Sequence, residues 1–182
     1  KVEVFNHHLC HAASVFYSSG FKESAILIVD GRGSDDETQS LFIGDESGLR
    51  LIENTKTIGI GLLYTAVTRA IGFGPLQEGK TMGLAPFGSS ERGQILDING
   101  VFNGIETNYE NCVSDGEHRL RNFHVPLETF EQQAQAAYQV QQECEKAMLH
   151  LAKHAKKITG MNKLCISGGV ALNSVANYKI LN

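Results

Sequence analysis

The stretch NHHLCHAASVFYSSGFKESAILIVDGRGSDDET, residues 6–38, decides the fold of this chain. It opens with three histidines in five positions, continues into the apolar run AILIVD and then reaches the turn DGRG at residues 30–33. His7 and His11 are four residues apart, so they lie on one face of a helix and can share one metal ion. Asp30 follows the apolar run directly. The stretch therefore predicts a helix, a buried strand and a turn that place a metal beside a nucleotide.

The turn after the strand has the composition of a phosphate-binding turn. Gly31 and Gly33 carry no side chain, so their backbone N–H groups can approach a phosphate closely. A second glycine pair, Gly168 and Gly169, follows the apolar run LCIS and opens a helix whose N-terminus can face a phosphate or a ribose. Two such turns on facing walls of one cleft predict a nucleotide site, and a plain hairpin is the alternative for the first of them.

The histidines have a structural alternative as core or capping residues, because their pattern lacks the glutamate of the zinc-protease motif. His8 lies on a different face of the helix from His7 and is available to donate a hydrogen bond or to contact substrate. A second pair with the same spacing, His150 and His154, lies beside lysines near the end of a helix. For that pair a favourable interaction with the helix dipole is the simpler interpretation.

The apolar periodicity predicts an α/β fold. Asn6 can cap the histidine helix and Gly20 can end it, while residues 1–5, KVEVF, alternate like a short strand. The runs SAILIVD, TQSLFIG and LRLIENTK, separated by short turns, predict an antiparallel meander. Residues 58–73 and 132–158 repeat apolar side chains at helical spacing and predict two helices. We expect the longer helix to pack on one face of the sheet and LCIS to join the first meander strand in parallel.

Residues 74–93 predict a functional loop with a short helix. They contain GPLQEGKT, which formally matches the phosphate loop G-x-x-x-x-G-K-[ST]. That motif should follow a buried strand, whereas here it follows a helix and contains Pro75, so we reject it. Lys80 remains a candidate to hold a phosphate or a carboxylate as a mobile point charge. Residues 94–130 mix polar residues, glycines and isolated aromatics, which predicts an irregular excursion within the domain.

The composition excludes several classes of protein. The 182 residues are 42% hydrophobic and 20% charged with a net charge of −4, which suits one globular domain or a large part of one. The lysines and arginines are scattered, so the basic face of a nucleic-acid binder is missing, and no apolar run is long enough to span a bilayer. Cys10, Cys144 and Cys165 have apolar or helical surroundings and are expected to be buried thiols in a reducing cytoplasm.

Four motifs, taken together, resemble the NodU/CmcH family of O-carbamoyltransferases. They are NHHLCHAAS followed by FYSSGF, VDGRG followed by E-T, EGKTMGLAPFG, and ISGGVALNSVANYKI, spread over residues 6–180 in the family's order. The resemblance implies an α/β fold of the ribonuclease-H-like, actin-like ATPase type, with a mixed sheet, an antiparallel meander and flanking helices. It also implies that residues 1–182 are a partial carbamoyltransferase domain, truncated at both ends.

The resemblance implies an ATP-dependent activity. Carbamoyl phosphate and ATP yield a carbamoyl-adenylate, whose carbamoyl group moves to the hydroxyl of a small-molecule acceptor beside a divalent metal. Mixed nitrogen and oxygen ligation fits iron, zinc or manganese. Nucleic acid and membrane are not expected partners, a homodimer is left open, and the expected location is cytoplasmic. A later metal aspartate, a first phosphate hairpin and the adenylate-forming domain of the family lie outside the chain, so the fragment alone is not expected to turn over.

Matched residue by residue, the resemblance assigns His7, His11 and Asp30 to the metal. The predicted cofactor site joins the matched glycine turns and asparagine with two nearby cations: Gly31, Arg32, Gly33, Lys80, Gly168, Gly169 and Asn173. His8 and Lys80 are the candidates for catalysis. An actin-like sugar kinase or ATPase, with Asp30 on Mg²⁺, and a regulatory nucleotide-binding module without catalysis are the alternatives. Metal bound to the purified protein would separate the carbamoyltransferase from both.

Overall fold

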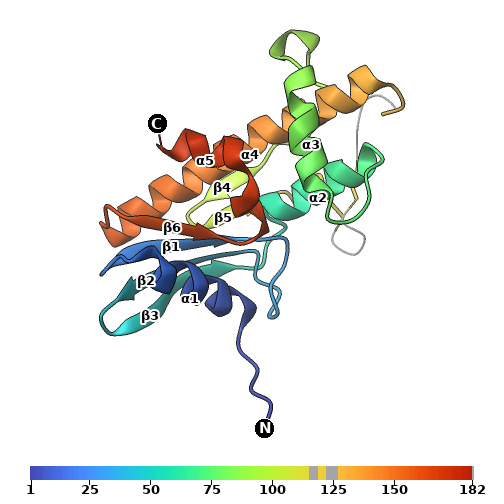
Figure 1. The fold of residues 1–182 in the computed structure, drawn as a ribbon. Coiled ribbons are helices and arrows are strands. Elements are labelled where there is room, and N and C mark those ends of the chain that lie inside the picture. The colour runs from blue at the N-terminus through green and yellow to red at the C-terminus, as the bar shows by residue number, and fades with distance from the viewer. Residues whose placement is uncertain (115–118, 122–126, 182) are drawn as a thin grey trace.

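A computed structural model describes residues 1–114, 119–121 and 127–181 of the chain. Its centre is a mixed four-stranded sheet in the order β3-β2-β1-β6 (Figure 1). The strands are β1 (Ser24–Val29), β2 (Gln39–Asp45), β3 (Gly48–Thr55) and β6 (Leu164–Ser167). β1 pairs antiparallel with β2, β2 pairs antiparallel with β3, and β6 joins β1 in parallel. The predicted meander and the parallel placement of LCIS are therefore confirmed.

One face of the sheet is covered by α1 (His7–Ser19). Asn6 caps this helix as predicted, because its Oδ1 accepts the N–H of Leu9 at 2.9 Å. Gly20 ends the helix in the left-handed conformation, with φ at 73°. The buried side of α1 packs on side chains that point to this face from the strands. This small core consists of Ala12, Phe16, Ile26, Ile28, Phe42 and Cys165.

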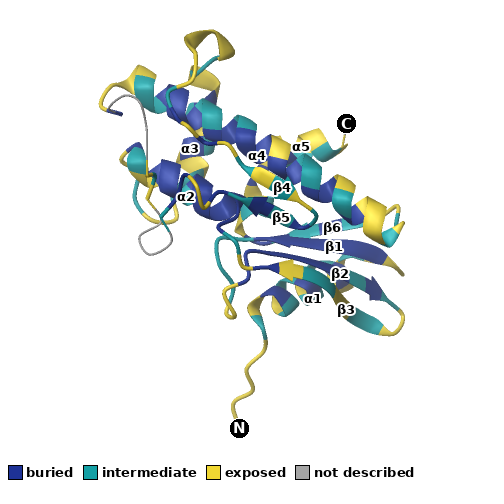
Figure 2. Ribbon diagram, turned by 180° about the vertical axis from the view of Figure 1, so that it is seen from behind, coloured by how far each residue is buried: buried dark blue, intermediate teal, exposed yellow. Residues whose placement is uncertain are grey.

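The opposite face carries the larger core and four helices. They are α2 (Ile60–Ala70), α3 (Glu78–Leu84), α4 (Phe130–Thr159) and α5 (Ser174–Leu181). α4 contacts β1, α2, α3 and α5, and buried residues recur along it (Figure 2). A capping box of Thr129 and Gln132 starts α4, and Gly160 ends it with φ at 67°, so the predicted long helix is confirmed. Within the described ranges, no helix has both the length and the apolar composition needed to cross a membrane.

The expected excursion contains a hairpin that the sequence did not reveal. β4 (Val101–Asn103) and β5 (Glu106–Asn108) pair antiparallel as a separate two-stranded sheet. Three 3-10 turns complete the described structure, namely η1 (Ala85–Phe87), η2 (Ser90–Arg92) and η3 (Gly169–Leu172). Residues 115–118 and 122–126 of the predicted excursion lie outside the described residues.

Two local predictions are wrong. Residues 1–5 form no strand, and Val2 and Val4 are each 90% exposed, because no described strand lies beside them to complete a ladder. Cys10 is exposed, since its position on α1 faces away from the sheet, whereas Cys144 and Cys165 are buried as expected.

The second histidine pair has a tertiary role that its dipole interpretation did not anticipate. Nε2 of His154 lies 2.6 Å from Oε2 of Glu53 on β3, and Nε2 of His150 lies 2.9 Å from the carbonyl oxygen of Gly104 in the β4–β5 hairpin. These contacts tie α4 to the edge strand and to the hairpin.

Candidate metal centre and adjoining cavity

Two histidines of α1 and the aspartate at the end of β1 converge on one point. The Nε2 atoms of His7 and His11 lie 3.1 Å apart, and they lie 3.0 and 3.3 Å, respectively, from Oδ2 of Asp30. Ligand atoms of the three residues all lie within 4.8 Å of one another, which is close enough to share one ion. The structure thus brings together the three predicted metal ligands, and metal binding itself stays a prediction.

The sheet holds the second ring nitrogen of His11. Its Nδ1 lies 3.0 Å from Oγ of Ser167, the last residue of β6. Metal-binding histidines commonly use their other nitrogen in this way, because the contact fixes the tautomer and the orientation of the ring. Here it leaves Nε2 of His11 directed at Asp30 and His7.

Both glycine turns orient the carboxylate of Asp30. Its Oδ1 accepts the backbone N–H groups of Gly31 at 2.7 Å and Gly169 at 3.2 Å, which leaves Oδ2 for the histidines. Burial alone would raise the pKa of Asp30, but these N–H groups and His7 outweigh burial and hold the pKa below its ordinary value. The ionised form required of a metal ligand is therefore favoured. The same N–H groups were predicted to hold a phosphate, and that contact stays a prediction.

The loop after β1 fixes the start of α1. Besides capping the helix, Asn6 donates from Nδ2 to Oδ2 of Asp35 at 2.8 Å and to Oε1 of Glu37 at 2.6 Å. The N–H of His7 donates to Oγ of Ser34 at 3.1 Å. Glu37 is only 2% exposed, and burial alone would raise its pKa. Hydrogen bonds from its own backbone N–H, from Asn6 and from the N–H of Asp35 lower that pKa instead, so a charged Glu37 ties the histidine helix to the loop.

His8 lies between α1 and the sheet. It is 1% exposed, and its Nδ1 lies 2.7 Å from Oγ of Ser40 on β2. Burial lowers the pKa of His8, which favours the neutral ring. Among the described residues its Nε2 has no hydrogen-bond partner. In this arrangement His8 docks α1 on β2, and its catalytic role stays a prediction.

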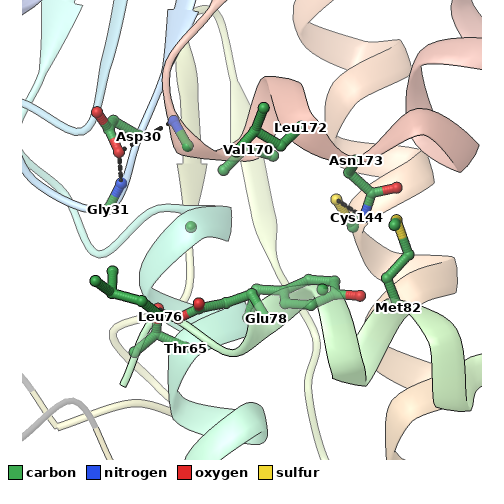
Figure 3. A pocket seen from close by; sticks show the side chains of 14 residues that line it. Asp30, Gly31, Thr65, Leu76, Glu78, Met82, Cys144, Val170, Leu172 and Asn173 are labelled. Carbon is green, nitrogen blue, oxygen red and sulfur yellow. Dashed lines mark hydrogen bonds between the residues drawn. The ribbon is translucent and has the colours of Figure 1, made fainter. Parts of the chain in front are cut away.

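A cavity of about 500 Å³ lies beside Asp30, the residue that His7 and His11 contact, and Figure 3 shows the side chains that line it. Its walls come from the end of β1, from α2, from residues 76–82, from η3 and from α4. The lining residues are Asp30, Gly31, Gly61, Tyr64, Thr65, Leu76, Glu78, Gly79, Met82, Cys144, Gly169, Val170, Leu172 and Asn173. The volume suits a small-molecule site. Asp30 belongs both to this cavity and to the cluster with His7 and His11.

The cavity has chemically different ends. Asp30 lies at one end, and Met82 and Cys144 lie at the other (Figure 3). Between them, Oγ1 of Thr65 donates to Oε1 of Glu78 at 2.9 Å, which holds this carboxylate in the wall. Burial raises the pKa of the Cys144 thiol to about 12, so this end of the cavity stays uncharged. The arrangement suits a ligand with a polar part near Asp30 and an apolar part near Met82.

A buried pair of amides, Gln141 and Asn173, supports the cavity wall and connects it to α2. Oδ1 of Asn173 accepts from Nε2 of Gln141 at 3.1 Å and from the N–H of Ala176 at 3.0 Å. Nδ2 of Asn173 donates to Oε1 of Gln141 at 2.9 Å, and the hydroxyl of Tyr64 donates to the same oxygen at 2.9 Å. Asn173 therefore lines the cavity with its amide engaged by the protein, and its predicted contact with a nucleotide stays a prediction.

The two glycine turns are adjacent and do not lie on facing walls. β1 and β6 are neighbouring parallel strands, so both turns leave the same edge of the sheet. Gly31 and Gly169 line the cavity. Gly168 does not, but its φ of 98° and the 2.4 Å that would separate its Cβ from the carbonyl oxygen of Val29 both require glycine. The segment after Gly168 is the four-residue turn η3, and α5 starts only at Ser174, so the expected α-helical N-terminus is displaced from the turn.

Besides Gly168, three further predicted cofactor residues lie outside the cavity lining: Arg32, Gly33 and Lys80. Arg32 pairs with Asp36 at 3.2 Å. Nζ of Lys80 donates to Oε1 of Gln77 at 3.0 Å. Their roles in nucleotide binding or catalysis stay predictions.

Several site residues escaped the sequence analysis. Gly61, Tyr64 and Thr65 come from α2, whose apolar periodicity indicated only a core helix. Glu78 and Ser167 lie in two of the motifs that carry the family resemblance, but neither was assigned to the site. The one available signal was the glycine at position 61 in the first turn of a helix, which is typical of a close backbone approach.

Comparisons with known proteins identify relatives along the whole chain. A family model described as carbamoyltransferase N-terminus matches residues 1–182. Nodulation protein NolO of Bradyrhizobium diazoefficiens is 31% identical over 188 residues, which cover 97% of this chain and 33% of NolO. Nodulation protein NolNO of Sinorhizobium fredii is 31% identical over 195 residues, which cover 100% of this chain and 27% of NolNO.

An uncharacterized protein of Synechocystis is 35% identical over 200 residues, which cover 98% of this chain and 32% of that protein. The chain thus spans about a third of the length of the curated relatives it matches.

Proposed function

This chain belongs to the carbamoyltransferase N-terminus family, and on that premise we propose that it forms the metal- and nucleotide-binding part of an ATP-dependent O-carbamoyltransferase. The proposed donor is a carbamoyl-adenylate made from carbamoyl phosphate and ATP, and the proposed acceptor is a hydroxyl of a small molecule. The proposal includes the actin-like, ribonuclease-H-like assignment of the fold. The antiparallel meander extended by one parallel strand supports that assignment.

One observation carries the proposal: Asp30 is shared between the histidine cluster and the cavity. Its Oδ2 faces His7 and His11, while the residue also lines the end of a cavity of about 500 Å³. A ligand in the cavity would therefore have its polar end beside the proposed metal. Group transfer from an adenylate needs this arrangement, because the reacting carbonyl must lie close to the group that stabilises the developing charge.

The residues present fit a divalent metal. Two imidazole nitrogens and one carboxylate oxygen converge, and the remaining polar atoms of His11 and Asp30 are occupied by Ser167 and by backbone N–H groups. This donor set suits iron, zinc or manganese. Held by His7, His11 and Asp30, such an ion would supply Lewis acidity toward a carbamoyl oxygen or an acceptor alcohol.

The cavity residues fit an adenylate. The carboxylate of Glu78, oriented by Thr65, is suited to accept hydrogen bonds from ribose hydroxyls. Met82, Val170 and Leu172 provide the apolar surface that a nucleobase requires. The mixed anhydride would then lie with its carbamoyl end toward Asp30.

The test uses the full-length protein and the variant His11→Ala. We expect the wild type to bind metal and to release AMP from ATP in the presence of carbamoyl phosphate and hydroxyl acceptors. His11→Ala should lower the metal affinity at least about 100-fold and suppress AMP release, because it removes a ligand. Metal content is measured in the purified protein, and AMP by chromatography.

His150→Ala is the matched control, since it also removes one histidine of an i, i+4 pair, but this histidine contacts Gly104 and the ring of Phe102 and, among the described residues, belongs to no carboxylate cluster. It should retain both metal and activity. Full metal content in His11→Ala would contradict the proposed centre. AMP release that is independent of carbamoyl phosphate would instead favour an ATPase or a kinase.

A further inference from the structure

The β4–β5 hairpin supplies a missing cap to α2. Gly59 precedes the first residue of α2 and has no side chain to accept its free N–H groups. Oγ1 of Thr107 on β5 accepts the N–H of Ile60 at 3.2 Å, from 47 residues away. The residue just before a helix normally caps it by accepting the N–H of the second or third helical residue, but Thr107 instead accepts the N–H of the first. Here tertiary structure delivers the capping hydroxyl from a distant hairpin.

Gln39 on β2 holds Thr107 in place. Its Nε2 donates to Oγ1 of Thr107 at 2.7 Å, and its Oε1 accepts the N–H of Thr107 at 3.0 Å. Both residues are 0% exposed, so water does not compete for these bonds. A Cβ at Gly59 would lie 2.2 Å from Nε2 of Gln39, which shows how tightly the amide fits beside the helix start.

The first turn of α2 lies in close contact with the backbone of Asp30. A Cβ at Gly61 would lie only 2.5 Å from the carbonyl oxygen of Asp30. On the other side, the N–H of Asp30 donates to the carbonyl oxygen of Thr38 at 2.9 Å, next to Gln39 in the chain. Asp30 thus contacts both Thr38, the residue before β2, and the first turn of α2. The same helix carries Tyr64 and Thr65 into the cavity wall.

We propose that Gln39 and Thr107 are positioning residues of the site, which set the placement of α2 against Asp30 without touching the cavity. Neither residue lines the cavity. Testing this role through ATP affinity rests on the proposed function, because ATP is the proposed ligand of the cavity. The excursion that carries β4 and β5 is thus part of the architecture of the site.

The test compares three variants of the full-length protein. Thr107→Val keeps the shape of the side chain and removes its hydroxyl, and Thr107→Ser keeps the hydroxyl. Thr55→Val is the control, because Thr55 also contacts the hairpin, at Glu106, but not α2. We expect Thr107→Val to weaken ATP binding about tenfold, because it removes both hydrogen bonds that Oγ1 accepts, from Ile60 and from Nε2 of Gln39, while Thr107→Ser restores it. The thermal midpoints of the two valine variants should fall by similar amounts.

Hydrogen exchange at Ile60 and Gly61 provides a readout that needs no ligand. Exchange should accelerate in Thr107→Val and not in Thr55→Val, since only the first loses the cap. Unchanged ATP affinity in Thr107→Val, or equal loss in Thr55→Val, would overturn the inference and leave the proposed function intact. If the wild type itself binds no ATP, the proposed function fails, and exchange alone decides: unchanged exchange at Ile60 overturns the inference, and accelerated exchange supports it.

Discussion

At the scale of single residues, the site shows that spacing does not define a metal ligand. His7 and His11 have the same i, i+4 spacing as His150 and His154. The first pair meets a carboxylate held at a strand end, whereas the second pair meets a backbone carbonyl and the edge-strand residue Glu53. The two pairs differ in the residues that face them from the neighbouring elements and in the hydrogen-bond partners that orient each ring.

Ser167 and Ser40 give a prediction at this scale, because each hydroxyl contacts one histidine of α1. Ser167→Ala should weaken metal binding about tenfold, since it frees the ring of His11 to rotate. Ser40→Ala should instead lower the free energy of unfolding by about 1 kcal/mol, because it removes the buried partner of His8. Metal titration and chemical denaturation of both variants check the two outcomes.

The prediction requires that Ser167→Ala weakens metal binding more than Ser40→Ala does. If Ser40→Ala weakened metal binding as much as Ser167→Ala, the orientation of His11 by Ser167 would have no special part in the centre.

At the scale of elements, α2 shows how a helix can be placed by its first turn. Its N-cap is a glycine, its cap comes from Thr107, and its second residue is a glycine in contact with the backbone of Asp30. The apolar face of α2 explains why it packs in the core. Only the contacts of its first turn explain why α2 lies beside Asp30 and not elsewhere on the sheet.

Gly61→Ala tests this close approach. The new methyl group would lie 2.5 Å from the carbonyl oxygen of Asp30, which is a backbone atom and cannot move aside cheaply. We expect ATP affinity of the full-length protein to fall at least about tenfold, because overpacking of this size costs about 1–3 kcal/mol and displaces α2. Isothermal titration with ATP measures the change.

Gly83→Ala on α3 is the matched control, since no heavy atom beyond its chain neighbours and the backbone of its own helix lies within 4 Å of a Cβ built there. It should leave ATP affinity unchanged and stabilise the helix by up to about 1 kcal/mol. Equal ATP affinity in both variants would refute the placement of α2 by contact with Asp30.

At the scale of the whole molecule, the sheet separates two cores of unequal size. α2 and α4 lie on one side of the sheet and α1 lies on the other (Figure 1). The side with α2 and α4 carries the larger core, and the side with α1 carries the small one. Both histidine ligands lie on α1, whereas the cavity lies among the helices of the other face and η3. Asp30 and Ser167, at the ends of neighbouring strands, connect the two sides.

Phe16→Ala tests the dependence of the metal centre on the small core. The ring of Phe16 is 5% exposed and lies over Gly44 of β2, so its loss should weaken the docking of α1 by about 3 kcal/mol. Hydrogen exchange of the α1 amides should accelerate accordingly, and metal affinity should fall with it.

Tyr17→Ala is the control, because Tyr17 is the next residue on α1 and is 68% exposed. It should change the opening free energy measured by hydrogen exchange of the α1 amides by no more than about 0.5 kcal/mol. Unchanged metal affinity in Phe16→Ala, despite faster exchange, would mean that the centre does not depend on the docking of α1.

Much of the local structure could be predicted from sequence, because its causes are local. Asn6, Gly20 and Gly160 mark helix ends through capping and left-handed φ, and the continuous apolar run of β1 indicates a strand buried on both faces. The strand predicted for residues 1–5 failed, since alternation alone cannot supply a neighbouring strand.

By itself, the sequence determined the order of the main-sheet strands, the histidine helix, the long helix and the three candidate metal ligands, since periodicity, caps and the His7–His11 spacing act over a few residues. Only the tertiary structure decided that the glycine turns are adjacent, that Gly31 and Gly169 orient Asp30, and that the cavity wall comes from α2 and Glu78. The contacts responsible join residues far apart in the chain, such as Thr107 to Ile60 and His11 to Ser167. Such partners are chosen by how the strands and helices pack, and no short-range pattern encodes that choice.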